Sequence, residues 1–195
     1  MVVGDNSVWF KLCDQGVIVT QSSNFIYLIA FGSNKGDIYS HCQRGMDLIA
    51  ESPLIGQISV SRWIQTPPMA SEIYSTSEHQ DYLNFVAEVE TSLNPRDFHH
   101  LLQKVEDTIG HDRSAKWLPR ELDIDILFAS TVNSKNSKFD KGVPLRFFSE
   151  NSTLLIPHYD IMNRDFLLEL IVKDLKISMQ TLYEHVGKTE GGLSH

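Results

Sequence analysis

The most informative stretch of the chain is residues 116–128, which read KWLPRELDIDILF. In its second half, apolar side chains alternate with two aspartates: Leu122, Ile124, Ile126 and Phe128 on one parity, Asp123 and Asp125 on the other. This alternation is typical of a β-strand that presents one face to a core. We therefore expect the four apolar side chains to be buried together and the two carboxylates to point together to the opposite side.

Two carboxylates on one face of a strand repel each other. At a Cβ separation of roughly 6.6 Å and an effective dielectric constant of roughly 20, the repulsion is about 2 to 3 kcal/mol. A divalent cation would turn this repulsion into attraction, and Mg²⁺ is usually held by one or two carboxylates together with substrate phosphates. Arg120 lies close by in the sequence and could bind a phosphate through two hydrogen bonds. Alone, an Asp-x-Asp pair is more often simply the acidic outer face of a strand.

The composition is that of one globular domain of 195 residues. Its net charge of -8 predicts no general attraction to nucleic acid or to anionic membranes. Cys13 and Cys42 are far apart and show no metal-ligand spacing. The longest apolar run, 25–31, is too short to cross a bilayer, and the amino terminus lacks the positive segment of a secretory signal. We expect a cytosolic protein.

Hydrophobic periodicity and helix-start signals predict six core elements. In chain order they are a strand at 25–31, a helix at 37–51, a strand at 55–65, a strand at 82–89, a helix at 94–109 and a strand at 122–128. The order strand, helix, strand, strand, helix, strand is that of an α+β ferredoxin-like βαββαβ sandwich, an antiparallel sheet with helices packed on one side. A further helix is expected to begin near Phe166.

The remaining segments are assigned by composition. Residues 1–24 are expected to be an extension or linker, and residues 25–195 the folded domain. Within the domain, polar loops at 70–81 and 111–120 are long enough to close over a site. Residues 130–152, rich in Ser, Asn and Lys, are expected to form a surface insertion.

Several short segments match one known family in the right order. They are Phe31-Gly32-Ser33-Asn34, Thr66-Pro67-Pro68, Tyr82-Leu83-Asn84, Glu106, Trp117, the Arg-x-x-Asp-Ile-Asp-Ile-Leu segment from Arg120, Pro157-His158-Tyr159-Asp160 and Asn163-Arg164-x-Phe166. Together they resemble the 6-hydroxymethyl-7,8-dihydropterin pyrophosphokinases of folate synthesis. The resemblance implies a ferredoxin-like fold, a monomer and three mobile loops around the site. Fusions to neighbouring pathway enzymes also occur in this family.

The resemblance also implies an activity, the transfer of diphosphate from ATP to the hydroxymethyl group of the dihydropterin with release of AMP. It implies that Asp123 and Asp125 bind two Mg²⁺ ions that bridge the ATP phosphates, and that Arg113, Arg120 and His158 contact those phosphates. The implied ATP-binding residues are Gln103, Glu106, Arg113, Trp117, Arg120, Ile126, His158 and Tyr159.

The pterin site implied by the resemblance combines aromatic faces with polar edge groups. Tyr82 and Phe166 match the pair that sandwiches the ring, and Arg164 matches a mobile arginine. The implied pterin-binding residues are Asn34, Thr66, Pro67, Met69, Tyr82, Asn84, Trp117 and Phe166. Taken singly, these would by default be core aromatics, loop anchors or strand-end polar residues. Their occurrence together with the aspartate pair favours a site.

Two residues depart from the family pattern. His111 stands where the family commonly has arginine, and Leu118 stands where it usually has a small residue, so closure of this loop could differ. Two other classes of function remain as alternatives. One is a ferredoxin-like module that binds a nucleotide or a pterin without turnover, which the intact Asp123, Asp125 and Arg120 disfavour. The other is a nucleic-acid-binding domain, which the acidic balance disfavours.

Overall fold

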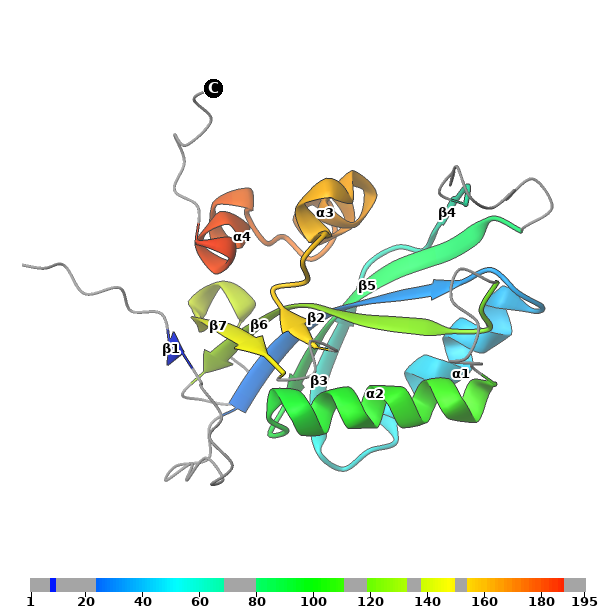
Figure 1. Cartoon of the computed structure of the whole chain (residues 1–195), viewed down its shortest axis with the longest axis horizontal. Coiled ribbons are helices and arrows are strands. Elements are labelled where there is room, and N and C mark those ends of the chain that lie inside the picture. The colour runs from blue at the N-terminus through cyan, green and yellow to red at the C-terminus, as the bar shows by residue number, and fades with distance from the viewer. Residues whose placement is uncertain are drawn as a thin grey trace, which may run out of the picture.

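The computed structural model describes residues 8–9, 24–68, 80–110, 119–132, 138–149 and 154–187 (Figure 1). Five residues that the sequence analysis placed in the site or its loops lie outside these ranges: Met69, His111, Arg113, Trp117 and Leu118. Most of the polar loop expected at 70–81 also lies outside them. The predictions for these residues therefore remain predictions.

Seven elements form the central part of the fold. They are β2 (Asn24–Ser33), α1 (Ile38–Ala50), β3 (Ile55–Val60), β4 (Ile64–Thr66), β5 (Tyr82–Thr91), α2 (Pro95–Ile109) and β6 (Asp123–Val132). The sheet order β6-β2-β5-β3, with antiparallel neighbours, confirms the predicted ferredoxin-like class. The strand expected at 55–65 is divided into β3 and β4, which both pair with β5.

The two central helices begin where the sequence indicates. The carboxylate of Asp37 accepts a hydrogen bond from the backbone N–H of Ser40 at 3.1 Å and so caps α1. The amide oxygen of Asn94 accepts from Arg96 and Asp97 at 3.0 and 3.1 Å and caps α2. These caps fix the chain's entry into each helix.

The chain beyond β6 extends the sheet and covers its second face. These elements are η1 (Phe139–Lys141), β7 (Val143–Phe148), β8 (Leu155–Ile156), η2 (Ile161–Asn163), α3 (Asp165–Lys173) and α4 (Met179–Val186). β7 pairs with β6 and β8, and the two-residue β1 (Val8–Trp9) lies parallel to β7. The surface insertion expected at 130–152 does not hold for Phe139, Leu145 and Phe147, which are buried. These side chains belong to the cores.

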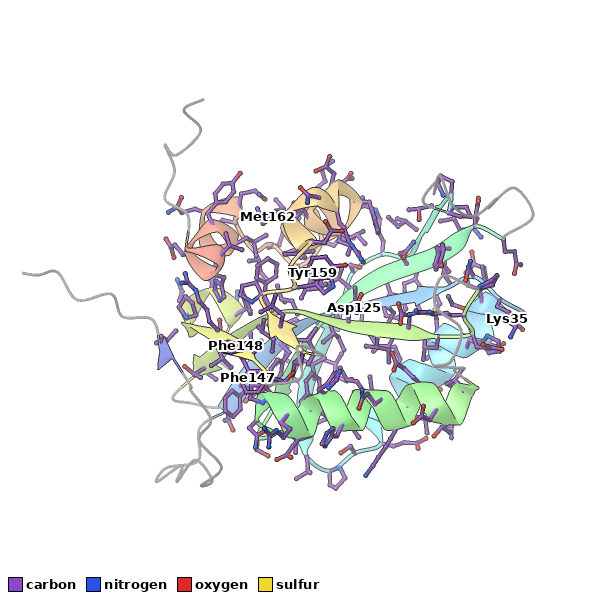
Figure 2. All side chains as sticks on the ribbon, in the orientation of Figure 1. Lys35, Asp125, Phe147, Phe148, Tyr159 and Met162 are labelled. Carbon is purple, nitrogen blue, oxygen red and sulfur yellow. The ribbon has the colours of Figure 1, made fainter. Side chains whose placement is uncertain are left out.

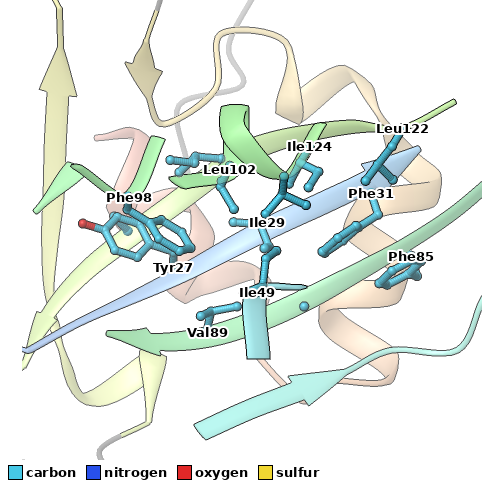
Figure 3. Close-up of a cluster of buried hydrophobic side chains, with 14 of the residues drawn as sticks. Tyr27, Ile29, Phe31, Ile49, Phe85, Val89, Phe98, Leu102, Leu122 and Ile124 are labelled. Carbon is cyan, nitrogen blue, oxygen red and sulfur yellow. The ribbon is translucent and has the colours of Figure 1, made fainter. Parts of the chain in front are cut away.

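Two hydrophobic cores lie on opposite faces of the sheet. The helices α1 and α2 cover one face, and α3 and α4 cover part of the other (Figure 1). Tyr27, Ile29 and Phe31 of β2 point into the core beneath α1 and α2 (Figure 3). Leu28 and Ala30 point into the core beneath α3 and α4. The second core explains why β2 reads as a continuous apolar run. None of the helices in the described ranges is long and apolar enough to cross a membrane.

A β-bulge in β6 changes the predicted pattern. Leu28 pairs with Phe128 while the next residue, Ile29, pairs with Ile126, so Leu127 is an extra residue in β6. As a result, both Leu127 and Phe128 contribute to the core beneath α3 and α4. The expectation that Phe128 shares a face with Leu122, Ile124 and Ile126 is therefore wrong.

Candidate active site

The register of three neighbouring strands brings the candidate residues together on one face. Asp123 pairs with Gly32, and Gly32 pairs with Asn84, so these residues form one row across β6, β2 and β5. Asp125, Ala30 and Val86 form the adjacent row. Ala30 and Val86 belong to the core beneath α3 and α4, so both aspartates face that side.

Gly32 forms the floor between the two outer members of its row. A Cβ atom at Gly32 would lie 3.6 Å from Asn84 Oδ1 and 3.7 Å from Tyr82 Cδ1. A side chain would therefore fit against the described atoms but would fill the space above β2. Glycine leaves this space open between Asn84 and Asp123.

Two arginines oppose the two aspartates. Arg120 Nη1 lies 2.5 Å from Asp123 Oδ1, and Arg164 Nη1 lies 3.6 Å from Asp125 Oδ2. The aspartate side chains keep 33% and 36% of their surface exposed. Desolvation, together with the charge of Asp123, raises the pKa of Asp125 to about 6, although Arg164 and Arg120 act in the opposite direction. Asp125, labelled in Figure 2, is thus a carboxylate whose negative charge lacks full compensation.

This pair suits a hard divalent cation that also binds a phosphorylated ligand. Mg²⁺ is usually held by one or two carboxylates, and phosphates and waters complete its shell. Within the described ranges no group of three or more His, Cys, Asp or Glu side chains could hold a metal ion alone. The uncompensated charge of Asp125 is the feature of this site that such a cation would satisfy.

The turn after β2 holds the start of β6 in place. The backbone N–H of Asn34 donates to Arg120 O at 3.0 Å, and the Arg120 N–H donates to Asn34 Oδ1 at 2.8 Å. The Ser33 hydroxyl donates to Glu121 O at 2.6 Å, and Lys35 forms an ion pair with Glu121 at 2.6 Å. These contacts position Arg120 beside Asp123, a role that the sequence analysis missed because the partners are 86 or more residues apart.

The side-chain amide of Asn34 is only half used. Its oxygen accepts from Arg120, while its Nδ2 atom is buried and has no hydrogen-bond partner among the residues that the structure describes. An unpaired buried donor costs free energy unless a ligand accepts from it. Asn34 therefore offers a donor at the edge of the site.

Three of the residues predicted to bind the pterin, Thr66, Tyr82 and Asn84, lie where β4 pairs with the start of β5. Thr66 pairs with Tyr82, and Asn84 Nδ2 donates to Thr66 Oγ1 at 2.9 Å. Tyr82 is partly buried, and its pKa is raised first by burial and then by the charge of Asp123. Phe166, in the first turn of α3, packs against the core on the same face. Pro67 follows Thr66 and is exposed.

Two of the residues predicted to bind the nucleotide, Glu106 and His158, contact the outer edge of β6. Glu106 of α2 is buried, and its Oε1 accepts from the Ile124 N–H at 2.7 Å. The N–H of His158 donates to Leu127 O at 2.8 Å. By the alternation of strand hydrogen bonds, the backbone of Ile126 faces the same edge as that of Ile124. Gln103, one turn before Glu106 on α2, is partly buried.

His158 presents one ring nitrogen to the site. Its Nδ1 atom accepts from the Asp160 N–H at 3.3 Å, which leaves the proton of the neutral ring on Nε2. Desolvation, followed by the charge of Arg164, lowers the pKa of His158. Its ring lies 4.6 Å from that of Tyr159, which is 78% exposed. His158 is therefore a neutral hydrogen-bond donor near Arg164 and Asp160.

Paired carboxylates flanked by arginines belong to a class of site that serves phosphoryl transfer, in which the protein places the reacting groups and neutralises charge. A family model for 7,8-dihydro-6-hydroxymethylpterin-pyrophosphokinase matches residues 28–175, and the chain belongs to this family.

Curated relatives agree with this assignment. The 2-amino-4-hydroxy-6-hydroxymethyldihydropteridine pyrophosphokinase of Bacillus subtilis is 30% identical over 145 residues, which cover 74% of this chain and 75% of that protein. The protein of the same name from Haemophilus influenzae is 28% identical over 140 residues, 72% of this chain and 75% of the relative. A folate synthesis bifunctional protein of Chlamydia trachomatis is 30% identical over 150 residues, 77% of this chain but 30% of its own length.

Proposed function

We propose that the chain transfers diphosphate from ATP to the hydroxymethyl group of 6-hydroxymethyl-7,8-dihydropterin, giving the dihydropterin diphosphate and AMP in folate biosynthesis. The observation that carries this proposal is the row of Asp123, Gly32 and Asn84 across the sheet. It places a carboxylate and an amide on one face of the sheet with Gly32 between them, and Arg120 is bound to the carboxylate. Phosphate and pterin chemistry can therefore meet on one face.

The reaction is an in-line displacement at the β-phosphorus. The substrate hydroxyl attacks that phosphorus, the bond to the α-phosphate oxygen breaks, and AMP leaves. Catalysis then depends on alignment of the two oxygens and on neutralisation of charge. Bound Mg²⁺, proposed here as two ions, would supply electrostatic stabilisation and orient the phosphates. Asp123 and Asp125 are the residues that would hold it.

The chain's own cations and donors bind the ATP phosphates. Arg120 is already oriented by Asn34 and Asp123. His158 contributes its Nε2 proton as a neutral donor, and the proposal gives Arg113, outside the described residues, a similar role. Asp125 would hold the cation in place of its contact with Arg164, and Arg164 would then be free to contact a phosphate. Tyr159 lies beside His158.

The nucleotide is proposed to lie along the outer edge of β6. Glu106 of α2 contacts this edge from one side and His158 from the other, and Gln103, one turn before Glu106, is proposed to join them. The backbone of Ile126 lies between them and can form hydrogen bonds with a base. Trp117 is assigned to the same ligand by the sequence analysis alone.

The pterin is proposed to bind over Gly32 at the end of β5. Tyr82 and Phe166 supply aromatic faces, and Asn84 and Thr66 supply polar edge contacts. The unpaired Nδ2 of Asn34 is a donor for a ring oxygen or nitrogen. Pro67, Met69 and Trp117 complete the proposed lining. The attacking hydroxymethyl group would then point toward Asp123.

Three further expectations from the sequence remain proposals. They are a monomeric state, a cytosolic location, and a domain that covers residues 25–195 after an extension. Among the relatives, Lactococcus lactis has a bifunctional protein FolKE, of which the matched region covers 38%. We propose that this chain carries the pyrophosphokinase activity alone or as part of a fused protein.

The decisive experiment follows the nucleotide product. The protein is mixed with Mg²⁺, ATP and 6-hydroxymethyl-7,8-dihydropterin, and AMP and ADP are separated by chromatography. Pterin-dependent AMP supports diphosphate transfer. Formation of ADP alone, or no product at any protein concentration, would contradict the proposal and favour a binding module without turnover. Omission of the pterin is the matched control.

A further inference from the structure

Helix α3 spans the second face of the sheet between two charged contacts. At its start, Arg164 lies 3.6 Å from Asp125 of β6. At its end, Asp174 contacts Arg62 in the turn between β3 and β4. One row across the sheet runs from Asp125 of β6 through Ala30 of β2 to Val86 of β5. The carbonyl oxygen of Val86 accepts a hydrogen bond from the N–H of Ser61, the residue before Arg62 in the turn. The distance from β6 to this turn is three strand spacings, or about 14 Å. Helix α3 has nine residues, and its rise of about 1.5 Å per residue gives the helix a similar length.

Arg62 forms three hydrogen bonds to α3 and the residue that follows it. Its backbone N–H donates to Asp174 Oδ2 at 2.9 Å, and its Nη1 donates to Asp174 Oδ1 at 2.5 Å. Its Nη2 donates to Glu169 Oε1 at 2.7 Å. An isolated surface ion pair contributes little to stability. Here, however, Arg62 donates from its backbone N–H and from two guanidinium nitrogens at once. These three hydrogen bonds fix the orientation of the end of α3 relative to Arg62, in addition to pairing the charges.

The attachment of Arg62 to the sheet is rigid on both sides. The preceding Ser61 donates its N–H to Val86 O, and the Val86 N–H donates to Ser61 Oγ, both at 2.9 Å. The following Trp63 stacks on Phe85 with ring centroids 4.6 Å apart and an interplanar angle of 6°. Arg62 is therefore held by the sheet, and α3 is held by Arg62.

This clamp joins the two parts of the proposed pterin site. Phe166 lies in the first turn of α3, and β4, which follows Trp63, carries Thr66 opposite Tyr82. The charged contact at the start of α3 uses Asp125, a carboxylate assigned above to the cation. The buried side chains of α3 hold the helix against the sheet by packing, and Arg62 adds directional hydrogen bonds that do not depend on Asp125 and persist when that carboxylate changes partner.

We propose that Arg62 is a positioning residue for the pterin. By its hydrogen bonds to Asp174 and Glu169 it keeps Phe166 at a fixed height above the strand end that carries Tyr82. It sets the affinity for the flat ring more than the affinity for the nucleotide, because the nucleotide lies at the outer edge of β6 and meets α3 only through Arg164 at the start of the helix. This inference rests on the proposed function.

The test compares ligand affinities in matched variants. The variants are Arg62→Ala, which removes the clamp, Arg62→Lys, which keeps the charge but loses the fork, and Asp174→Asn, which weakens the clamp from the helix side. The control is Lys173→Ala, which breaks only the 3.2 Å pair with Glu169 within α3. Dissociation constants are measured for an ATP analogue with a methylene group between the α- and β-phosphates, and for the dihydropterin in its presence with Mg²⁺.

We expect Arg62→Ala to weaken pterin binding about tenfold and nucleotide binding less than twofold, because the ring contact of Phe166 is misplaced while Arg120 and His158, which lie outside α3, still bind the phosphates. Arg62→Lys and Asp174→Asn should lie between Arg62→Ala and the wild type, and Lys173→Ala should match the wild type. Hydrogen exchange of the α3 amides should be faster in Arg62→Ala than in Lys173→Ala. Equal losses for both ligands, an unchanged pterin affinity or unchanged α3 exchange would overturn the proposal.

The affinity test does not depend on turnover. If the wild-type protein binds the dihydropterin but forms no AMP, diphosphate transfer is wrong, while the comparison of Arg62→Ala with Lys173→Ala still decides the role of Arg62. If the wild-type protein binds no dihydropterin, both proposals are overturned. Thermal unfolding of each variant shows whether the native state is populated at the assay temperature.

Discussion

At the scale of single residues, the site depends on charges that the folded protein leaves incompletely compensated. Asp123 is paired with Arg120, whereas Asp125 shares a longer contact with Arg164 and has a raised pKa of about 6. Such a carboxylate costs stability in the absence of a ligand and contributes affinity in its presence. The periodicity of the sequence already predicted that the two aspartates share a face. The unequal pairing with the arginines could not be predicted, because Arg164 is 39 residues further along the chain.

Replacement of Asp125 tests this trade-off. We expect Asp125→Asn to raise the free energy of unfolding by about 1 kcal/mol at pH 7.5 in the presence of a chelator, because an unfavourable charge is removed from a partly solvated site. Turnover with Mg²⁺ should fall by about 10³-fold or more. Denaturant unfolding and an AMP assay measure the two effects. The control is Asp140→Asn, at an exposed residue of η1, which should leave both unchanged. A destabilised Asp125→Asn would contradict the prediction.

Tyr82 allows a test of ring stacking at one residue. Tyr82→Ala should weaken binding of the dihydropterin by about 1 to 2 kcal/mol, because one aromatic face is lost, and should leave binding of the ATP analogue within about twofold. Tyr82→Phe retains the ring and should retain most of the affinity. Titration calorimetry with each ligand separates the two outcomes. Similar losses for both ligands would show that Tyr82 has no specific stacking role.

At the scale of elements, the start of β6 is positioned from both sides of the strand. The turn after β2 binds Arg120 and Glu121, and α2 binds Ile124 through the buried carboxylate of Glu106. A β-bulge at Leu127 then changes the face of the sheet to which the side chains of the second half of β6 point. The helices α1 and α2, the start of α3 and the order of the elements from β2 to β6 were predictable from local periodicity and capping signals. The bulge, the break between β3 and β4, and the contributions of β7 were not, because each depends on pairing with a distant strand.

Glu106 provides a test of how α2 holds β6. Glu106→Ala should lower the free energy of unfolding by about 2 to 3 kcal/mol, because the buried N–H of Ile124 loses its acceptor. Glu106→Gln keeps an amide oxygen in the same place and should lose less than half as much. We also expect a weaker nucleotide affinity in Glu106→Ala, since the outer edge of β6 becomes less ordered. Chemical denaturation and analogue binding measure these effects; equal stability of the two variants would contradict the assigned hydrogen bond.

At the scale of the whole molecule, the second core ties the carboxyl-terminal helices to the sheet. His185 of α4 is buried; its ring stacks on Phe139 and its nitrogens lie 2.8 Å from Ser130 Oγ and from Thr181 O. Burial lowers the pKa of His185 from its ordinary value of 6.5. The neutral ring therefore joins α4, η1 and β6. Nothing in the local sequence around His185 indicated this role.

The titration of His185 predicts a pH dependence of stability. Because its pKa is lower in the folded than in the unfolded state, the unfolded protein binds more protons just below pH 6.5, and stability falls as the pH decreases from about 7 toward the folded-state pKa. His185→Phe should remove this part of the slope. Asp125 contributes in the opposite direction, because its raised pKa favours proton uptake by the folded state. Both the wild type and His185→Phe contain Asp125, so its contribution cancels when their pH slopes are compared.

Unfolding curves between about pH 5 and pH 8 measure this dependence. The exposed His100 gives a matched control, since His100→Gln should retain the wild-type slope. If the wild type and His185→Phe lose stability in parallel on acidification, His185 is not the group responsible.

The sequence by itself determined the kind and order of the elements from β2 to β6 and the shared face of Asp123 and Asp125, because periodicity, caps and breakers act among near neighbours in the chain. It also carried the segments that resemble the pyrophosphokinase family. Only the tertiary structure decided which residues of neighbouring strands pair in one row. It alone also decided that Asn34 positions Arg120 and that Arg62 clamps α3. These contacts join residues 86 to 112 positions apart, and they form because the two cores bury both faces of one sheet.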